Sequence, residues 1–467
     1  MSTYNDLRDF IKILEEKDEL KHITKEVSWD EEAAAVFIKS AKKNNRALIF
    51  DKVKDSKFPL IIGTLASPER IKLAIGKSGE GFDDFVDKVL NTKRDDFPAT
   101  TVASAPCQEV VITGDDVDLL SLPIPKFNEK EGGRYITAGV SISYDPETGA
   151  RNAGVYRMMA RDKNELNVNF GFPNRHLLMH AKKCQKMGKP LQVAIALGCD
   201  PAVWLCAAMP LPASYDEVNQ AGAIKGKGIE MVKGKTIDIN VPATAEIILE
   251  CEMDISVMKP EGPYNDFQGY YTRVKDNYVI KVKAITHRKG AIFETSMTGA
   301  VPEGEMEVYR HLLLSQQKVQ LKKVIPQVEA MTFDAASMGH IYIVSVRNKR
   351  PFMANQIGSA ILSFPWSNMV KMVIVVDNDI DIFDPAQVMW AIATRVDFEK
   401  DVTLLPNMPG ASFDVGTGGR KGVSKMILDA TMKLEDEGYP GKFPEAGRPS
   451  AKIVQFVRDN WKSYGLD

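Results

Sequence analysis

The stretch TIDINVPATAEIILECEMDIS, residues 236–256, decides what kind of fold the centre of the chain can adopt. Ile237, Ile239 and Val241 alternate with polar residues, which is the pattern of a half-buried strand. Similar strand-like stretches, ITAGVSISYD, YVIKVKAITHR and AIFETSM, lie before and after it and are separated by Gly-rich and Pro-rich breaks. Many short strands around one core predict a barrel-like or folded sheet, with a helix inserted at RHLLMHAKKCQKM.

The regions that flank this sheet mix helix and strand patterns. Before it, residues 6–20 have helical periodicity, ALIFDKV resembles a short strand, and Ser67-Pro68 marks the start of a further helix. After it, HIYIVSV, NQIGSAIL, KMVIVVDNDID and PAQVMWAIATR alternate between strand and helix, which predicts a parallel sheet covered by helices. The run KMVIVV is nearly all apolar, as is typical of a strand buried on both faces.

These patterns predict a mixed α/β (α+β) multidomain protein, because 467 residues are too many for one simple core. We expect five parts: an N-terminal α/β segment, a barrel-like domain, a connecting helix, a C-terminal α/β domain with a mixed sheet, and a tail with one amphipathic helix. Their expected boundaries are 1–112, 113–305, 306–326, 327–440 and 441–467.

The composition excludes several classes of protein. Lys+Arg total 60 and Asp+Glu total 62, so no basic excess indicates binding to nucleic acid or to an anionic membrane. No apolar run approaches the roughly 18 residues of a membrane span, and the polar N-terminus does not resemble a signal peptide. The five cysteines are scattered and never spaced C-x-x-C, which argues against a disulfide framework, a zinc ribbon and an iron–sulfur cluster. We therefore expect a cytoplasmic enzyme.

Two acids surround a Gly-Pro pair in MKPEGPYNDFQGYY, residues 258–271. Glu261 and Asp266 are five residues apart, so a regular strand would point them to opposite faces, and Gly262-Pro263 forbids a continuing helix. From the residues alone, the segment is either a polar surface turn or a bend that directs both acids into one pocket.

A second group of polar residues could hold a metal ion. GARNAGVYRMMAR contains Asn152 and Arg157, and NRHLLMH places His176 and His180 four residues apart on an expected helix. This histidine spacing is weak as a metal signature and is more often structural. Glu230 stands among lysines and glycines, which also fits an exposed basic turn. If Asn, His and Glu side chains converge, two oxygens and one nitrogen suit Mn²⁺ or Mg²⁺ better than zinc.

The glycine-rich stretch DVGTGGRKGVSKM, residues 414–426, is not a phosphate-binding fingerprint. It satisfies neither G-x-x-x-x-G-K-[ST] nor G-x-G-x-x-G. A mobile glycine loop, lying over a pocket, is the better interpretation.

The order of motifs along the chain resembles that of the UbiD family of reversible decarboxylases. The motifs are RNAGVYRMMA, NRHLLMH, VAIALGCDPAVWLCAAMPLP, GAIKGKGIEMVKG, VPATAEIILECE, PEGPYNDFQGYY, KMVIVVDNDIDIFDPAQVMWAIATR and SKMILDAT. The resemblance covers about nine-tenths of the chain, up to residue 432. It implies a central split β-barrel of the flavin-reductase type, prenylated FMN from a partner flavin prenyltransferase, Mn²⁺ at the cofactor phosphate with K⁺ nearby, and a homodimer or homohexamer.

The resemblance also implies roles for individual residues. Asn152, His176 and Glu230 fall on the family's metal ligands. Arg157 falls on its active-site arginine, and Glu261 and Asp266 fall on the two acids beside that arginine, with Asp266 as the proton donor. The expected cofactor-binding residues are Asn152, Ala153, Gly154, Val155, Tyr156, Arg157, Arg175, His176, Glu230 and Lys371. For Lys371, a lysine at the end of a strand is the ordinary alternative.

The expected activity is a reversible, non-oxidative decarboxylation of an aromatic, heteroaromatic or α,β-unsaturated carboxylic acid. The partners would be that acid and CO₂, with no nucleic acid and no membrane. We expect residues 295–305, His340 and the glycine loop to shape the pocket. Two alternatives stay open: an FMN-dependent oxidoreductase on a split barrel, which needs a site for reduced nicotinamide, and a non-catalytic assembly subunit.

Overall fold

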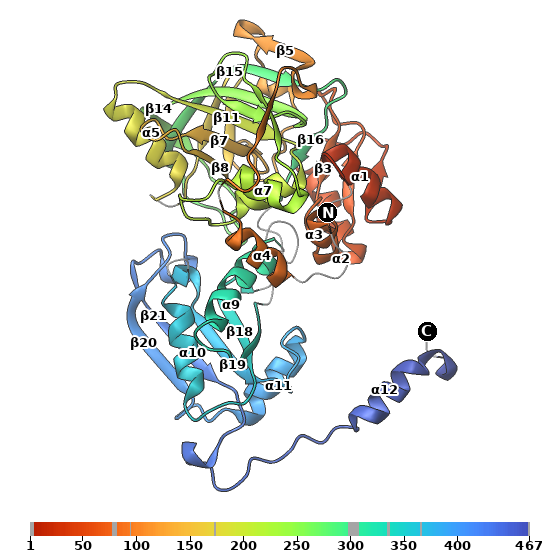
Figure 1. Cartoon of the computed structure of the whole chain (residues 1–467), viewed down its shortest axis with the longest axis vertical. Helices are drawn as coiled ribbons and strands as arrows, with labels where there is room; N and C mark the ends of the chain where they lie inside the picture. Colours follow the sequence, from red (N-terminus) through yellow and green to blue (C-terminus); the bar gives the residue numbers. More distant parts are fainter. Residues whose placement is uncertain are drawn as a thin grey trace.

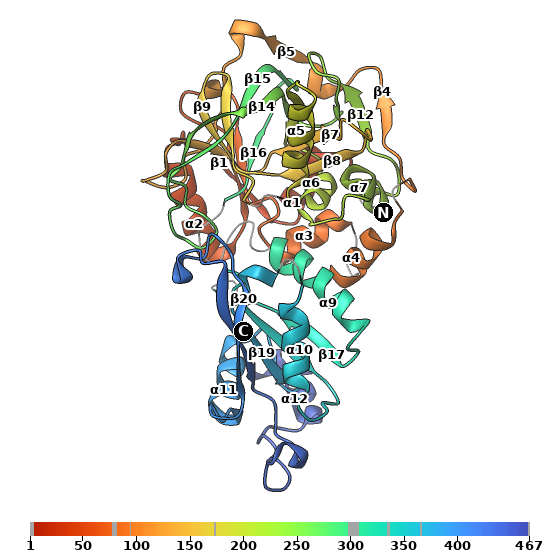
Figure 2. The ribbon, with the colours of Figure 1, turned by 90° about the vertical axis from the view of Figure 1, so that its left-hand side faces the viewer.

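The computed structural model describes residues 4–76, 82–93, 95–171, 174–297, 308–333, 337–364 and 367–465. The chain forms an upper lobe, which contains the N-terminal and central regions, and a lower lobe formed by the C-terminal region (Figure 1). Helices α4 (Phe82–Asn91) and α9 (Leu314–Lys322) lie side by side where the lobes meet (Figure 2), and Lys318 Nζ lies 2.6 Å from Asp83 Oδ2. The expected mixed α/β multidomain architecture is confirmed. Among the described helices, none is long and apolar enough to cross a bilayer.

The N-terminal region forms a four-stranded sheet in which the last strand comes from far along the chain. Its order is β1-β2-β3-β16, with strands β1 (Leu20–Ile23), β2 (Ala47–Phe50), β3 (Leu60–Ile62) and β16 (Phe293–Thr295). Helices α1 (Leu7–Glu16), α2 (Glu32–Asn44) and α3 (Pro68–Ile75) accompany it. Because β16 follows the whole central region in sequence, this sheet ties the first and second parts of the chain together.

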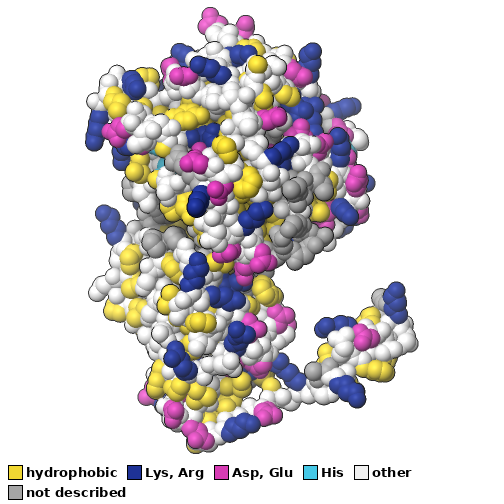
Figure 3. Space-filling view, in the orientation of Figure 1, with side chains coloured by type: hydrophobic (Ala, Val, Ile, Leu, Met, Phe, Trp, Pro, Cys, Tyr) yellow, Lys and Arg dark blue, Asp and Glu magenta, His cyan; other side chains and the backbone are white. Residues whose placement is uncertain are grey.

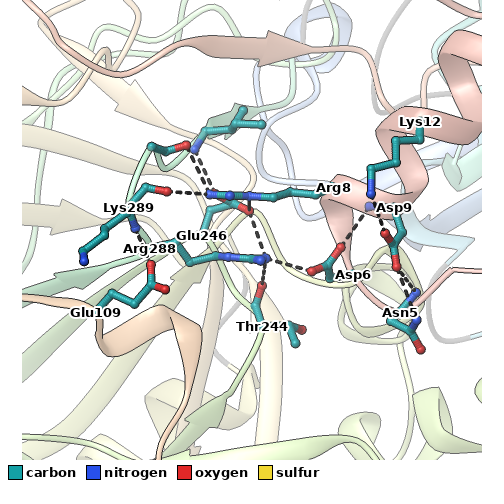
Figure 4. Close-up of polar contacts among 12 residues, drawn as sticks. Asn5, Asp6, Arg8, Asp9, Lys12, Glu109, Thr244, Glu246, Arg288 and Lys289 are labelled. Carbon is teal, nitrogen blue, oxygen red and sulfur yellow. Dashed lines mark hydrogen bonds and ion pairs between the residues drawn. The ribbon is translucent and has the colours of Figure 1, made fainter.

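A partly buried ion cluster holds α1 against the central region (Figure 4). Arg8 donates Nε and Nη2 to the two carboxylate oxygens of Glu246 at 2.7 and 2.8 Å, and Glu246 has no exposed surface. Arg288 Nη1 joins Asp6 Oδ2 at 2.8 Å to Glu246 Oε1 at 3.3 Å. A bidentate arginine–carboxylate pair fixes orientation as well as distance, so this cluster sets how the N-terminal segment sits.

The central region is a curled nine-stranded sheet, which confirms the expected barrel-like or folded sheet. Its order is β6-β9-β10-β15-β14-β11-β7-β8, and β5 pairs with β15 outside this path. The strands are β5 (Val110–Thr113), β6 (Arg134–Ile136), β7 (Val140–Tyr144), β8 (Arg151–Val155), β9 (Met158–Asp162), β10 (Glu165–Val168), β11 (Leu191–Leu197), β14 (Ile247–Glu261) and β15 (Lys275–His287).

The curl follows from a two-residue connection. Strand β8 is one edge of the sheet, yet only Tyr156 and Arg157 separate it from β9 near the opposite edge. So short a link spans roughly 10 Å at most, and the two ends of the sheet must therefore approach each other. The segment 152–157 lies in the resulting seam.

Helices and a small sheet cover the side of the barrel that carries β8. Helices α6 (Pro201–Ala208) and α7 (Glu217–Lys225) pack against β8, and α5 (His176–Lys186) packs against β7 and β14. A separate three-stranded sheet has the order β13-β12-β4, with β13 (Asn240–Pro242), β12 (Glu230–Lys233) and β4 (Thr100–Val102).

The strand expected from the alternation at residues 237–241 is only partly correct. Ile237, Ile239 and Val241 are all buried, but the regular strand is limited to β13. The Asp238 backbone N–H donates to the Gln192 side-chain Oε1 at 2.9 Å, and the Ile239 carbonyl accepts the Gly234 N–H at 2.8 Å. These backbone groups are therefore not available to a strand ladder.

The C-terminal region is a five-stranded mixed sheet, as expected. Its order is β17-β18-β19-β21-β20, with β17 (Val328–Thr332), β18 (Ile341–Val346), β19 (Met372–Asp377), β21 (Gly422–Asp429) and β20 (Val402–Pro409). Strands β18, β19 and β21 are parallel, and the outer two strands are antiparallel to their neighbours. Helices α10 (Met353–Leu362) and α11 (Pro385–Arg395) accompany the sheet. Of the expected connecting helix, residues up to 307 lie outside the described residues, and the rest contains a short π-helix (Tyr309–Leu313) followed by α9.

The tail leaves the lower lobe and ends in a separate helix, α12 (Ala451–Asp459), followed by a 3₁₀ turn (Trp461–Tyr464). Figure 1 shows this helix standing away from the rest of the chain.

Candidate active site

The seam between β8 and β9 brings two groups of predicted site residues onto one short segment. Asn152 lies on β8 and Arg157 lies in the link to β9. Between them, Gly154 has no room for a side chain, because a Cβ would lie 2.9 Å from the Tyr156 hydroxyl. The glycine thus allows the ring of Tyr156 to lie across the strand.

The first group consists of Asn152, His176 and Glu217. Asn152 Nδ2 lies 3.2 Å from His176 Nδ1 and donates to Glu217 Oε1 at 3.0 Å. Glu217 Oε2 accepts the Ala153 backbone N–H at 2.9 Å. His176 is the first residue of α5, and Glu217 is the first residue of α7, whose N-terminus is capped by the Asp216 side chain. Three separate elements therefore meet at this point.

The electrostatics of this first group suit a cation. Burial raises the pKa of Glu217 to about 7, and its carboxylate forms no ion pair among the described residues. Burial, and then the charge of Arg175, lowers the pKa of His176, which keeps a ring nitrogen available as a ligand. Asn152 Oδ1 is buried and accepts no hydrogen bond.

Two oxygens and one nitrogen around an uncompensated carboxylate are the donor set of a hard divalent ion. Within the described part of the chain, no cluster of three His, Cys, Asp or Glu side chains is placed to hold a metal. The first group contains only two side chains of those types, because its third member is an asparagine.

Glu230 is not part of this group. The structure therefore does not agree with the sequence-based prediction that Glu230 joins Asn152 and His176 as a metal ligand. It lies on β12 in the separate three-stranded sheet, and its side chain is exposed. The chain turns at Gly226 after α7, and β12 then pairs with β4, away from β8. The carboxylate at Asn152 is therefore that of Glu217. His180 also stands apart, since its Nδ1 lies 2.9 Å from the Ser143 hydroxyl.

The second group consists of Arg157, Glu261 and Asp266. Arg157 Nη1 donates to Asp266 Oδ2 at 2.7 Å, and Arg157 Nε lies 3.5 Å from Glu261 Oε1. Burial by itself would lower the pKa of Arg157, but the charges of Asp266 and Glu261 outweigh it and raise that pKa. The two acids thus share one permanently charged guanidinium.

Glu261 is the fixed member of this group and Asp266 the accessible one. The Glu261 side chain is 2% exposed, and its Oε2 accepts from Asn277 at 2.8 Å and from Asn169 at 3.4 Å. The Asp266 side chain is 25% exposed. A molecule that enters the site from solvent can therefore meet Asp266 and Arg157, while Glu261 holds the guanidinium from behind.

The bend at Gly262-Pro263 brings the two acids to one side. Gly132 packs directly against it, and a Cβ on Gly132 would lie 2.1 Å from the Gly262 carbonyl oxygen. The Gly132 N–H donates to the Pro263 carbonyl at 2.8 Å. After the bend, Asp266 begins a tight turn in which its carbonyl accepts the Gly269 N–H at 2.8 Å. A regular strand would have separated the acids, and the bend prevents this.

The tip of this turn touches the lower lobe. Gln268 Nε2 lies 2.7 Å from His340 Nε2, and His340 Nδ1 lies 2.7 Å from the Met369 carbonyl. The ring of Phe267 lies 5.2 Å from that of Phe413. Asp266 is therefore next to residues that connect the two lobes.

The other predicted cofactor residues lie around the seam, with one exception. Arg175 immediately precedes α5, and its guanidinium lies 5.9 Å from the Tyr156 ring centre. Ala153 is buried beside Glu217, and Val155 is half-buried at the end of β8. Lys371 instead belongs to the lower lobe, where its Nζ lies 2.6 Å from Asp414 Oδ1 at the start of the glycine loop.

Sequence reasoning missed Glu217, Asn169 and Asn277. A signal for Glu217 was present, because Asp216-Glu217 has the form of a helix N-cap followed by an acid in the first turn. The two asparagines had no comparable signal, since their role depends only on the positions of β10 and β15 relative to Glu261.

Three family profiles match the chain in order. They are the 3-octaprenyl-4-hydroxybenzoate carboxy-lyase N-terminal domain over residues 11–89, its Rift-related domain over 100–301 and its C-terminal domain over 312–430. An uncharacterised protein of Synechocystis sp. is 33% identical over 99% of this chain and 96% of its own length.

Several solved structures of UbiD-class enzymes and of decarboxylases are similar to this chain. The UbiD-class enzyme HmfF of Pelotomaculum thermopropionicum in complex with FMN is 29% identical, with a TM-score of 0.86 over 97% of this chain and 99% of that one. An evolved dimeric form of HmfF in complex with prFMN is 30% identical, with a TM-score of 0.82 over 96% and 97%. The vanillic acid decarboxylase of Sedimentibacter hydroxybenzoicus, in open form, is 29% identical, with a TM-score of 0.86 over 98% and 100%. The chain therefore belongs to the UbiD family of carboxy-lyases.

Proposed function

We propose that this chain is a reversible, non-oxidative decarboxylase of an aromatic, heteroaromatic or α,β-unsaturated carboxylic acid, and that it works with prenylated FMN. The observation that carries the proposal is the guanidinium of Arg157 between the carboxylates of Glu261 and Asp266. The FMN and prFMN complexes of HmfF support the choice of cofactor.

The first group of residues would hold the cofactor. Asn152 Oδ1, His176 and Glu217 would bind Mn²⁺, which would connect the flavin phosphate to β8, with K⁺ nearby. Residues 153–156 and Arg175 would line the cofactor along the seam. Lys371 would have to leave Asp414 before it could contact a phosphate. A flavin prenyltransferase would supply the modified flavin.

The chemistry explains why a cofactor is required. Loss of CO₂ from an sp² carbon leaves an anion in the plane of the ring or alkene, and no amino-acid side chain can absorb it. The prenylated flavin would supply the electron sink.

The second group would bind the substrate and move the proton. Arg157 would bind the substrate carboxylate through charge-assisted hydrogen bonds. Glu261, held by two asparagines, would keep the guanidinium in place. Asp266 would deliver a proton to the carbon that has lost CO₂, and it would remove that proton in the carboxylation direction.

The experiment is a panel of carboxylic acids in D₂O with protein produced together with a flavin prenyltransferase. We expect CO₂ release from at least one of the three acid classes, with one deuterium at the former carboxyl carbon. Protein that carries prenylated FMN but releases no CO₂ from any class, or that oxidises reduced nicotinamide instead, would contradict the proposal.

A further inference from the structure

Glu131 is a buried carboxylate that takes no part in the proposed chemistry. On the face drawn in Figure 3, acidic side chains stand at the surface among basic ones, whereas Glu131 is 6% exposed. Burial raises its pKa, and within the described part of the chain it forms no ion pair. A carboxylate in such a place is costly unless hydrogen bonds hold it, so its hydrogen-bond partners indicate its role.

The two oxygens of Glu131 bind two different loops. Oε2 accepts the backbone N–H groups of Phe127 and Asn128 at 2.8 and 3.2 Å, so its own loop folds around it. Oε1 accepts the Asn128 side-chain amide at 3.1 Å and the backbone N–H of Asn265 at 3.4 Å. Asn265 immediately precedes Asp266 in the chain. One carboxylate therefore joins its own loop to the segment that carries the proposed proton donor.

The segment that carries Asp266 is a short hairpin. Asn265 and Tyr271 face each other as an antiparallel bridge, and the Asp266 N–H donates to the Tyr270 carbonyl at 3.1 Å. These contacts hold the hairpin together, but they do not by themselves place it relative to Arg157. Its placement therefore depends on contacts with other loops.

The residues on both sides of Glu131 make further contacts with this hairpin. The Lys130 backbone N–H donates to the Tyr271 hydroxyl at 3.2 Å, and the Gly132 N–H donates to the Pro263 carbonyl at 2.8 Å. Three consecutive residues thus hold both arms of the hairpin, with the Glu131 carboxylate between the other two contacts. Of these three residues, Glu131 makes its contact with a side chain and can be changed without altering the backbone.

We propose that Glu131 is a positioning residue, which holds the hairpin so that Asp266 stays in contact with Arg157 and can reach the reacting carbon. The inference rests on the proposed function, because the role of Asp266 as proton donor does. Proton transfer requires the donor and the acceptor to lie within hydrogen-bond distance. A misplacement of about 1 Å can lower a rate by about a hundredfold. Glu131 acts through Asp266 and not on the substrate itself.

An isosteric variant separates this role from support of the loop of Glu131 itself. In Glu131→Gln, the amide oxygen can stay at the position of Oε2, where the Phe127 and Asn128 N–H groups point. The amide NH₂ group then replaces Oε1 and faces the Asn265 N–H, donor against donor. The Asn128 side chain can turn its amide over and still bind. The variant therefore breaks the contact with the hairpin and keeps the loop.

Two further variants complete the test. Glu250→Gln is the matched control, because the buried Glu250 carboxylate also accepts two backbone N–H groups, those of Lys235 and Thr236 at 2.7 and 2.5 Å, outside both groups of site residues. Tyr271→Phe is a second test variant, which removes the Lys130 contact. The Tyr271 side chain is 40% exposed, so this variant should fold.

The first measurement is hydrogen–deuterium exchange of the full-length proteins, prepared with and without flavin. Peptides that cover residues 264–272 should exchange several-fold faster in Glu131→Gln than in the wild type, because the hairpin loses an anchor. They should exchange somewhat faster in Tyr271→Phe and at the wild-type rate in Glu250→Gln. The flavin-free measurement does not depend on the proposed function, because it needs neither cofactor nor substrate.

The second measurement is steady-state kinetics of the cofactor-loaded proteins on an acid that the wild type decarboxylates. For Glu131→Gln, kcat should fall by about 10–100-fold. KM, flavin content, metal content and melting temperature should stay near the wild-type values, because Arg157 and the first group of site residues are untouched. The solvent deuterium isotope effect on kcat should increase, because proton delivery becomes slower. Tyr271→Phe should show a smaller fall in kcat, and Glu250→Gln should show none.

Unchanged exchange of residues 264–272 or an unchanged kcat in Glu131→Gln would overturn the inference. So would a fall in kcat that accompanies a lower melting temperature or a loss of flavin, because Glu131 would then support the fold in general. If Glu131→Gln does not fold, Tyr271→Phe decides by the same two measurements. A wild type that releases CO₂ from no acid would instead overturn the proposed function, and the exchange measurement would still decide whether Glu131 holds the hairpin.

Discussion

The two groups of polar residues at the ends of segment 152–157 handle negative charge in opposite ways. Around Asn152, the buried carboxylate of Glu217 has no basic partner in the described residues, and burial raises its pKa to about 7. Around Arg157, two carboxylates share a guanidinium that belongs to the chain itself. The carboxylate of the first group thus lacks a basic partner, whereas both carboxylates of the second group lie beside one.

This difference assigns separate tasks to the two ends of the seam. A buried carboxylate without a counter-ion is costly unless it is neutralised or binds a cation. The first group is therefore suited to recruit a metal and the ligand that the metal carries. The second group contains its own cation, Arg157, and is suited to hold an anionic substrate and to transfer a proton. Substitutions can test whether the two tasks are separable.

The largest effect is expected at Asp266. Asp266→Asn should lower turnover by about 10²–10⁴-fold, because an amide cannot deliver the proton that a carboxylic acid can. Flavin and metal content should stay at wild-type levels, since the first group is untouched. Steady-state rates of cofactor-loaded protein, with Asp276→Asn on the exposed part of β15 as a control, check this. If the variant also lost its flavin, the two groups would not be independent.

The next largest effect is expected at Glu217. Glu217→Ala should weaken metal binding by about a hundredfold or more, because it removes the one carboxylate at Asn152, and flavin should be lost with the metal. Glu230→Ala is the matched control and should retain both, since its side chain is exposed on β12. Metal analysis of the two purified variants shows whether Glu217 or Glu230 supplies the metal-binding carboxylate. Loss of metal from the Glu230 variant alone would restore the sequence-based assignment.

The buried carboxyl of Glu294 tests whether burial without a basic partner raises the pKa of a carboxyl in this protein. Glu294 accepts a hydrogen bond from Thr64 Oγ1 at 2.6 Å, and burial raises its pKa to about 7. A raised carboxyl pKa means that stability is greatest below the unfolded value of about 4.5 and falls as the pH rises towards 7.

Between pH 4.5 and pH 8, the unfolding free energy of Glu294→Gln should therefore fall by about 2–3 kcal/mol less than that of the wild type. Urea unfolding at the two pH values measures the difference. An equal fall in unfolding free energy in both proteins would mean that burial without a basic partner does not raise the pKa of such carboxyls in this protein.

The smallest effect is expected at the contact between the Asp266 turn and the lower lobe. Gln268→Ala removes the hydrogen bond to His340, which is worth about 1 kcal/mol, so kcat should fall several-fold while metal and flavin content stay constant. His340→Ala should have a similar effect, and the double variant should be no worse than either single one. Additive losses would show that the two side chains do not act as a pair.

Part of this molecule could be predicted from local sequence. The alternation and length of apolar runs predicted the element types, and Ser67-Pro68 predicted where one helix begins. The strand expected around Ile237 is shorter than predicted because the Gln192 side chain, from a different strand, accepts the Asp238 backbone N–H. Such long-range competition leaves no mark in a local pattern.

The sequence by itself indicated the family, through motifs that are runs of neighbouring residues, and it placed Glu261 and Asp266 on either side of Gly262-Pro263. Only the tertiary structure decided which acid joins Asn152. Glu217 and Glu230 follow it by 65 and 78 residues, and the packing of α7 against β8 selects the first while the pairing of β12 with β4 removes the second. Residues far apart in sequence meet only where packed elements bring them together, and a carboxylate is recruited by where it lies in space and not by the residues beside it in the chain.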